Sequence, residues 1–340
     1  MKQDKHKKIL LVGGGTLGSV SPLLAVANKY SADYLFIGSH QGPEKNMVEA
    51  AGLEFKSISS GKLRRYWSWS NFVDLFKLKL AWWQSIFLLV KFKPDIVLTS
   101  GSFVAVPVAW AAWLLRIPVI VHQQDIGVGL ANKLMAPVAK KISVTFAASK
   151  NLFKANKVVV TGNPVRVDNK KTTDQPTIVI TGGGLGARDF NQFLAEFIPR
   201  LTETHKIHHI LGTKNYDQAL ALPNYQPYKF IEQGMINLLA QADIIISRAG
   251  LSLTTEAAAL KKALIIIPIP DSHQEDNAKF FAQHNAAIMV KQGSSQILAR
   301  YLDKLLPNKK FQQVLGENLY NLFPKNPVDK YIKLIEDVLK

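Results

Sequence analysis

The chain has 340 residues, 47% of them hydrophobic and 20% charged, and it contains no cysteine. This composition excludes a disordered chain, and the absence of cysteine excludes disulfides, thiol catalysis and cysteine-based metal sites. The formal net charge of +17 favours a polyanionic partner, such as nucleic acid, an anionic membrane or a phosphorylated substrate.

Short apolar runs alternate with helical patterns, as is typical of parallel strands covered by helices on both faces. We expect an α/β fold with two doubly wound domains, 1–163 and 164–325, and a C-terminal helix over 326–340 that packs back toward the first domain. The polar stretch 167–176 is the best linker candidate. The predicted strands cover residues 9–12, 34–37, 96–98, 119–121, 142–144, 158–160, 178–180, 209–211, 244–246 and 264–267.

Two glycine-rich loops, 13–18 and 182–187, each follow a predicted strand. Such a loop lets backbone N–H groups approach a phosphate closely. A dinucleotide site also needs an acidic residue at the end of the second strand, but these strands end in Gly38-Ser39 and Gly212-Thr213. A nicotinamide or flavin site is therefore disfavoured. The alternative is that the glycines only make tight turns.

Residues 62–93 combine seven basic residues with one acid and contain four of the six tryptophans. Tryptophan prefers the headgroup level of a membrane, and each basic residue near an anionic leaflet contributes about 1 kcal/mol. Ordinary core packing and nucleic-acid binding are the alternatives, but no nucleic-acid module is recognisable. We expect an anionic membrane partner and no nucleic acid, with contacts from Arg64, Arg65, Trp67, Trp69, Lys77, Lys79, Trp82 and Trp83.

Residues 96–115 carry no charge and approach the length of a membrane-spanning helix. Because residues 99–102 form a polar, glycine-containing interruption, we predict a strand, a turn and a buried helix instead. The basic first eight residues precede only a four-residue apolar run, which no signal peptide pattern fits.

Further motifs occur in a fixed order at 14–27, 122–125 with 129–133, 162–166, 182–188, 247–256 and 273–278. Together they resemble the motifs of the MurG family of peptidoglycan N-acetylglucosaminyltransferases. The resemblance implies a GT-B fold, two Rossmann-like domains with the active site in the cleft between them. It implies inverting transfer of GlcNAc from UDP-GlcNAc to the MurNAc C4 hydroxyl of lipid I, at the cytoplasmic face of the plasma membrane, giving lipid II. No DxD motif is suitably placed, so we expect no cofactor and no metal.

The resemblance places most of the donor site in the second half of the chain. The helix that starts at 248–252 can bind an anion at its N-terminus. Glu256, one turn inside this helix, could accept hydrogen bonds from two ribose hydroxyls, or it could be a solvated charge on the helix surface. His273 is either a phosphate donor or a loop histidine, and Arg166 either stabilises the leaving diphosphate or braces the hinge. The predicted donor residues are Thr16, Gly18, Arg166, Gly183, Gly184, Asn191, Arg248, Gly250, Ser252, Glu256, His273, Gln274 and Glu275.

Departures from the family pattern cluster in the first half of the chain. Ser19 replaces the loop histidine that is the favoured general base of the family, and a serine cannot take a proton near neutral pH without its own base. We therefore predict that Asp125 deprotonates the acceptor, with His122 as the fallback. The predicted catalytic residues are Asp125, His122 and Ser19, and the predicted acceptor residues are Gly15, Ser102, Phe103, Gln123 and Asn132.

Two other functions remain open. The replacements Ser19, Phe103 and Gln123 also fit a membrane-associated relative that binds a UDP-sugar without turning it over. A different UDP-sugar enzyme on the same fold, such as a 2-epimerase, is the third possibility.

Overall fold

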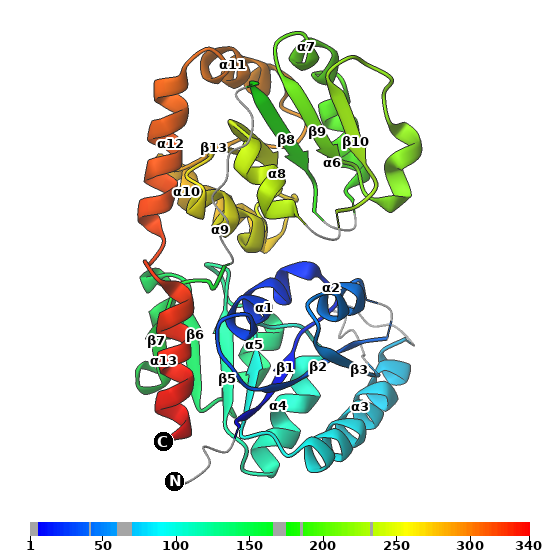
Figure 1. Ribbon diagram of the computed structural model, residues 1–340, viewed down its shortest axis with the longest axis vertical. Helices are drawn as coiled ribbons and strands as arrows, with labels where there is room; N and C mark the ends of the chain where they lie inside the picture. Colours follow the sequence, from blue (N-terminus) through cyan, green and yellow to red (C-terminus); the bar gives the residue numbers. More distant parts are fainter. Residues whose placement is uncertain (1–5, 41, 60–69, 166–174, 184–185, 232–233) are drawn as a thin grey trace. The chain divides into compact units, whose positions relative to one another are not determined.

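The computed structural model describes residues 6–340 except 41, 60–69, 166–174, 184–185 and 232–233. It divides into two compact units (Figure 1). The N-terminal unit contains residues 1–164 and 324–340, and the C-terminal unit contains residues 165–323. Most of the predicted linker, 167–176, lies outside the described residues.

The N-terminal unit is built on a parallel sheet whose described strands follow the order β3-β2-β1-β4-β5-β6-β7. The direction of this order reverses between β1 and β4, the point at which ligands bind in doubly wound folds, and the first glycine loop follows β1. The strands are β1 Lys8–Val12, β2 Asp33–Ser39, β3 Glu54–Ile58, β4 Ile96–Thr99, β5 Val119–Gln123, β6 Lys141–Val144 and β7 Val158–Val160.

Helices cover both faces of this sheet. Buried residues of α1, α2 and α13 pack against one face, and those of α3, α4 and α5 pack against the other. The C-terminal helix α13 therefore belongs to the N-terminal unit. The helical segments are η1 Leu17–Ser19, α1 Ser21–Ala27, α2 Glu44–Ala50, α3 Ser70–Phe92, α4 Ala105–Leu114, α5 Leu130–Met135, η2 Ala147–Leu152, η3 Ala155–Lys157 and α13 Pro327–Leu339.

The uncharged stretch 96–115 forms strand β4, a turn and helix α4, as predicted. Most of α4 is buried against the sheet, which explains its apolar sequence without a bilayer. Within the part of the chain that the structure describes, no helix combines the length and the hydropathy needed to cross a membrane.

The C-terminal unit repeats the architecture, with the parallel order β10-β9-β8-β11-β12-β13. The order reverses between β8 and β11, and the second glycine loop follows β8. Its elements are β8 Thr177–Thr181, α6 Arg188–Ala195, α7 Ile198–Thr202, β9 Lys206–Ile210, η4 Thr213–Gln218, β10 Tyr225–Tyr228, α8 Met235–Gln241, β11 Ile244–Ser247, α9 Leu251–Ala259, β12 Ala263–Ile266, α10 His273–Gln283, β13 Ile288–Met289, α11 Ser295–Leu305 and α12 Lys309–Leu322. Buried side chains of α6, α7, α11 and α12 join the core on one face of the sheet.

The sequence analysis missed strands β3, β10 and β13, each at the edge of its sheet. The edge strands β3 and β10 contain polar residues and lack a continuous apolar run, and β13 is only two residues long. The analysis also placed β9 too late, because the strand contains His208 and His209. Both histidines are buried. Their Nδ1 atoms lie 2.8 and 3.0 Å from the hydroxyl oxygens of Tyr228 and Tyr225 in the neighbouring strand β10.

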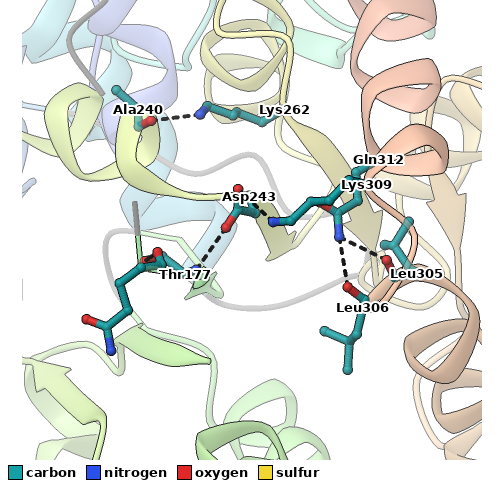
Figure 2. A network of polar contacts seen from close by, with 9 residues as sticks. Thr177, Ala240, Asp243, Lys262, Leu305, Leu306, Lys309 and Gln312 are labelled. Atoms are coloured by element: carbon teal, nitrogen blue, oxygen red, sulfur yellow. Dashed lines mark hydrogen bonds and ion pairs between the residues drawn. The ribbon is translucent and has the colours of Figure 1, made fainter. Parts of the chain in front are cut away.

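A polar network braces the amino end of the second sheet (Figure 2). Asp243 Oδ2 accepts the backbone N–H of Thr177 at 3.0 Å, and Oδ1 lies 3.2 Å from Lys309 Nζ. The Asp243 side chain is only 11% exposed. Nearby, Gln312 Nε2 donates to the carbonyls of Leu305 and Leu306 and so ties α12 to the end of α11.

We expect Asp243→Ala to lower the thermal unfolding midpoint of the protein by roughly 2–10 °C, because a buried N–H without its acceptor costs about 1–3 kcal/mol. Scanning calorimetry measures this shift. Asp303→Ala is the matched control, since Asp303 pairs with Arg200 at the surface, where an ion pair is worth about 0–1 kcal/mol. Equal shifts in the two variants would contradict a structural role for Asp243.

Candidate functional site

The first glycine loop is closed by Ser19. The Ser19 hydroxyl accepts the N–H of Gly14 at 3.0 Å and lies 3.1 Å from the carbonyl oxygen of Thr16. A Cβ atom at Gly13 would lie 2.9 Å from the Ser19 carbonyl oxygen, so glycine is required for this close approach. Ser19, one of the predicted catalytic residues, is buried and bonded within its own loop, so its side chain shapes the loop.

Glu44, which the sequence analysis missed, lies beneath the same loop. Its fully buried carboxylate accepts the N–H of Ser39 at 2.7 Å through Oε1 and the N–H of Gly15 at 3.3 Å through Oε2. The carboxylate therefore joins the end of β2 to the glycine loop. The available sequence signal was an acid in the first turn of the helix that follows β2.

Gln124, also missed, connects three loops at the carboxyl edge of the first sheet. Its Nε2 donates to the carbonyl oxygens of Gly18 at 3.0 Å and Ser100 at 3.4 Å. The Ser100 hydroxyl in turn donates to the Ser19 carbonyl. The loops after β1, β4 and β5 are thus held as one surface, while Gly15 and Thr16 at the tip of the glycine loop are exposed.

The predicted acceptor residues Gln123 and Asn132 bond to each other instead of facing solvent. Asn132 Nδ2 donates to Gln123 Oε1 at 2.7 Å, and Gln123 Nε2 donates to the carbonyls of Asp125 and Gly127 at 2.9 and 2.8 Å. Both side chains are buried. They fix the loop that follows β5.

This fixed loop carries Asp125, which is half-buried. The turn after β4 carries Ser102 and Phe103, which are also half-buried. Ser102 has a φ of 92°, a left-handed conformation that is unusual for serine, and its hydroxyl accepts the N–H of Val104 at 3.4 Å. Backbone strain of this kind is typical of functional sites.

His122, the predicted fallback proton acceptor, lies at the end of β5 inside the fold. Its side chain is fully buried, with Nδ1 2.8 Å from Ser143 Oγ and Nε2 2.9 Å from Asn163 Oδ1. Burial lowers the pKa of His122 to about 4. With both nitrogens bonded inside the fold, the imidazole has no free position for a substrate proton. It packs edge-on against Tyr331 of α13, 5.7 Å away.

The second glycine loop depends on two close approaches. A Cβ atom at Gly182 would lie 2.6 Å from that of Ala187, and one at Gly186 would lie 2.5 Å from the Leu211 carbonyl oxygen. Gly183 is exposed and has a φ of 107°, which favours glycine. Gly184 lies outside the described residues, as does Arg166.

Asn191, a predicted donor residue, is buried behind this loop. Its Nδ2 donates to the Leu211 carbonyl at 2.9 Å, and its Oδ1 lies 3.2 Å from His209 Nε2. Burial lowers the pKa of His209 to about 4. Both polar atoms of the Asn191 amide are therefore engaged in the fold.

The turn between β11 and α9 is organised by Arg248. Its Nη1 donates to the carbonyls of Ile267 and Pro268 at 3.1 and 3.0 Å, and its guanidinium lies 5.0 Å from the ring centre of Phe190. Burial lowers the pKa of Arg248 from its usual value. Its Nε is buried without a hydrogen-bond partner among the residues described, so the guanidinium retains donor capacity.

Helix α9 begins just after this turn, and Asn277 of α10 holds the turn in place. Asn277 Nδ2, which is buried, donates to the Ala249 carbonyl at 3.1 Å. Asn277 lies in the motif at 273–278, and the motif alone did not indicate this role. Gly250 is the N-cap of α9, Ser252 lies in its first turn and Glu256 is one turn further. All three are partly exposed.

The start of α10 carries the remaining predicted donor residues. Ser272 caps the helix by accepting the N–H of Gln274 at 3.3 Å, and Gln274 Oε1 accepts the Ile269 N–H at 3.2 Å. His273 is exposed, and Glu275 lies 3.8 Å from Lys279 one turn along. Among the described residues, no cluster of three or more His, Asp or Glu side chains could hold a metal ion.

A patch of exposed apolar side chains lies on α3 and α4, which pack against each other. Trp83 and Phe87 of α3 are 65% and 66% exposed. We call this surface the aromatic patch; its members are Leu80, Trp83, Phe87, Val90, Trp110, Trp113 and Leu114. Trp82 is half-buried beside Trp83, and Lys79 is exposed. The other predicted membrane contacts have side chains outside the described part of the structure; they are Arg64, Arg65, Trp67, Trp69 and Lys77.

Comparison with known proteins agrees with the two-unit architecture. The glycosyltransferase family 28 N-terminal domain matches residues 9–144, and the glycosyltransferase family 28 C-terminal domain matches residues 177–326. The UDP-N-acetylglucosamine--N-acetylmuramyl-(pentapeptide) pyrophosphoryl-undecaprenol N-acetylglucosamine transferase of Clostridium novyi (strain NT) is 34% identical over 356 residues, which cover 98% of this chain and 99% of the relative.

Two solved structures extend this comparison. The crystal structure of Acinetobacter baumannii MurG has a TM-score of 0.73 at 28% identity and covers 97% of this chain and 99% of its own. The UDP-GlcNAc 2-epimerase of Neisseria meningitidis, bound to UDP-GlcNAc, has a TM-score of 0.69 at 16% identity, with 97% and 100% coverage. At this lower identity the likeness shows the shared fold alone.

Proposed function

Because the chain belongs to glycosyltransferase family 28, we propose that it transfers GlcNAc from UDP-GlcNAc to the MurNAc C4 hydroxyl of lipid I, forming lipid II for peptidoglycan synthesis. The acceptor oxygen attacks the anomeric carbon of GlcNAc, the bond from that carbon to the diphosphate oxygen breaks, and UDP leaves. Direct displacement inverts the donor configuration, so the product linkage is β.

The sugar nucleotide binds the C-terminal unit. The N–H groups at the start of α9 face an anion favourably, and the Arg248 guanidinium next to them adds positive charge. Glu256, one turn into α9, is spaced to accept the two ribose hydroxyls. Gln274 and Glu275 at the start of α10 select the GlcNAc hydroxyls.

Charge on the departing diphosphate is stabilised by fixed donors of the chain without a metal ion. The start of α9 and Arg248 supply these donors, and Thr16, Gly18 and the exposed Gly183 are the proposed glycine-loop contacts of the sugar nucleotide. Since hydrogen bonds inside each unit hold these loops in place, little reorganisation is needed when negative charge develops.

The acceptor binds the carboxyl edge of the N-terminal sheet, against Gly15, Ser102 and Phe103. Asp125 takes the proton of the attacking hydroxyl. Gln123 fixes the backbone of its loop, so that the carboxylate is held at a strand end where a substrate can approach. This assignment gives the reaction a base although Ser19 occupies the histidine position of the family.

The observation that supports the proposal most strongly is the similarity to a named transferase over 98% of the chain. The turn held by Arg248 and Asn277 supports the position of the donor site. The test is UDP release from UDP-GlcNAc with and without a lipid I analogue. Release that depends on the acceptor supports transfer. Binding without release would favour the non-catalytic alternative, and appearance of the C2 epimer would favour an epimerase.

The aromatic patch gives the enzyme a peripheral contact with the cytoplasmic face of the plasma membrane. Seven of the twelve large apolar side chains that are exposed among the described residues lie in this patch. Such concentration marks an interaction surface, and aromatic side chains favour the membrane interface. The contact keeps the N-terminal unit beside its lipid-linked acceptor.

We expect the double variant Trp83→Ser/Phe87→Ser to bind phosphatidylglycerol-containing vesicles at least roughly 10-fold more weakly, since burying one aromatic side chain contributes about 1.5–3 kcal/mol. Vesicle sedimentation measures this change. Ile297→Ser/Val314→Ser is the matched control, because both residues are exposed apolar side chains of the C-terminal unit. Retained vesicle binding by the Trp83/Phe87 variant would show that the patch does not face the membrane.

A further inference from the structure

His209, in strand β9, connects two other elements of the C-terminal unit. Its Nδ1 lies 3.0 Å from the hydroxyl oxygen of Tyr225 in β10, and its Nε2 lies 3.2 Å from Oδ1 of Asn191 in α6. All three side chains are buried. The proposed transfer reaction has so far given His209 no role.

The hydrogen bonds through these three residues run in one direction. Asn191 Nδ2 donates to the carbonyl oxygen of Leu211 at 2.9 Å, so the atom that faces His209 is the acceptor Oδ1. Burial lowers the pKa of His209 to about 4, which keeps the imidazole neutral near neutral pH. Its Nε2 therefore carries the ring proton, and its Nδ1 accepts from the Tyr225 hydroxyl. Burial raises the pKa of Tyr225 to about 12, so the hydroxyl keeps its proton.

This series of hydrogen bonds ends against the second glycine loop. The Leu211 carbonyl oxygen accepts from Asn191 and, at 3.3 Å, from Asn215 Nδ2. The same oxygen would lie only 2.5 Å from a Cβ atom at Gly186, so the loop packs directly on it. The Gly186 N–H in turn donates to the Gly183 carbonyl oxygen at 3.0 Å. The position of the Leu211 carbonyl thus sets how closely the loop approaches β9.

His208, the preceding residue of β9, makes a similar contact that does not lead to the loop. Its Nδ1 lies 2.8 Å from the Tyr228 hydroxyl oxygen. Successive side chains of a strand point to opposite faces, so His208 lies on the face away from Asn191. Its Nε2 is buried without a hydrogen-bond partner among the residues that the structure describes. Two neighbouring histidines therefore each bond a tyrosine of β10, and His209 alone of the two connects to the glycine loop.

We infer that His209 is a positioning residue for the diphosphate of the sugar nucleotide: through Asn191 and the Leu211 carbonyl it holds the second glycine loop in the shape that binds the phosphates. Because His209 is buried behind the loop, it acts through these groups and not by contact with the ligand. Without the Nε2 bond, the Asn191 amide loses one of its two anchors, and the carbonyl beneath the loop is no longer fixed. The inference rests on the proposed binding of UDP-GlcNAc to the C-terminal unit.

The test uses the different positions of the two ring nitrogens. An asparagine amide lies near the position of Nδ1, and a glutamine amide reaches the position of Nε2. His209→Asn therefore keeps a partner for Tyr225 and loses the bond to Asn191, whereas His209→Gln keeps a donor to Asn191. Calorimetry should show that His209→Asn binds UDP roughly 10-fold more weakly than the wild type, the usual contribution of a hydrogen bond to a charged group, and that His209→Gln retains most of the affinity. Uridine, which has no phosphate, should bind all three proteins equally.

His208→Asn is the matched control, because it replaces a buried histidine that bonds a tyrosine of β10 from the same strand. It should bind UDP like the wild type. Equal weakening of UDP and uridine by His209→Asn would mean a general loosening of the unit and would overturn the inference. Equal loss of UDP affinity in His209→Asn and His209→Gln would overturn it as well.

Hydrogen exchange of the ligand-free chain separates this inference from the proposed function. The Gly186 N–H should exchange roughly 10-fold faster in His209→Asn than in the wild type and in His209→Gln, because its bond to Gly183 opens more often when the loop is not held. Unchanged exchange in His209→Asn would show that His209 does not hold the loop. Absence of UDP binding by the wild type would contradict the proposed function, and the exchange rates would still decide the role of His209.

Discussion

Asp125→Asn is expected to lower kcat for UDP release by roughly 10²–10⁴-fold, the usual contribution of a general base. The amide keeps the size of the side chain but cannot take the proton from the acceptor hydroxyl. Gln123 Nε2 donates to the backbone carbonyl of Asp125, and this bond keeps the loop backbone in place in the variant. The KM for UDP-GlcNAc should therefore stay close to that of the wild type. Steady-state kinetics with a soluble lipid I analogue measures both constants.

Asp217→Asn is the control for this variant, since Asp217 is an exposed residue of η4 in the C-terminal unit. It should leave both constants unchanged. The pH profile gives an independent readout, because loss of the base should remove the acidic limb of log kcat. If Asp125→Asn turns over at the wild-type rate, Asp125 is not the base.

Glu256→Gln is expected to raise the KM for UDP-GlcNAc by roughly 10- to 100-fold, since a hydrogen bond to a charged group is worth about 1.5–3 kcal/mol. The two ribose hydroxyls are proposed to donate to this carboxylate in the second turn of α9. The ground state and the transition state bind the ribose alike, so kcat at saturating donor should change little. Initial rates over a range of UDP-GlcNAc concentrations provide the measurement.

The assignment of Glu256 to the ribose has a sharper test in a nucleotide analogue. The wild type should bind UDP more tightly than 2′,3′-dideoxy-UDP, and Glu256→Gln should lose most of that preference. Glu203→Gln, at an exposed position beyond α7, should keep it. An undiminished preference in Glu256→Gln would place the ribose contact elsewhere.

Much of the fold could be predicted because its signals are local. The central strands of both sheets are short, continuous apolar runs, as in Ile9–Val12 and Ile244–Ile246, and helical patterns separate them. Of the edge strands, only β7 was found in this way, and β3, β10 and β13 were not. The segment 54–58 contains three polar residues and no continuous apolar run. Strand β9 contains two histidines whose Nδ1 atoms bond tyrosines of β10.

The candidate site was predictable in its location but less so in the roles of its residues. The glycine loops follow β1 and β8, as the apolar runs before them predicted, and the structure adds that the strand order of each sheet reverses at these points. Several motif residues, however, turned out to bond other parts of the fold. His122, Gln123 and Asn191 are buried in such contacts. A motif identifies residue types that occur together, and it does not distinguish a ligand from a residue that holds a ligand in place.

The amino-acid sequence alone determined the two doubly wound domains and the positions of the glycine turns, because periodicity and glycine spacing act within a few tens of residues. The family followed from the resemblance of the ordered motifs to those of a known family. Only the tertiary structure decided which polar side chains remain available to a substrate. That outcome depends on contacts between distant segments, such as Gln124 with Gly18, Glu44 with Gly15 and Asn277 with Ala249. Whether a buried polar group finds its partner within the fold is settled only when the loops come together.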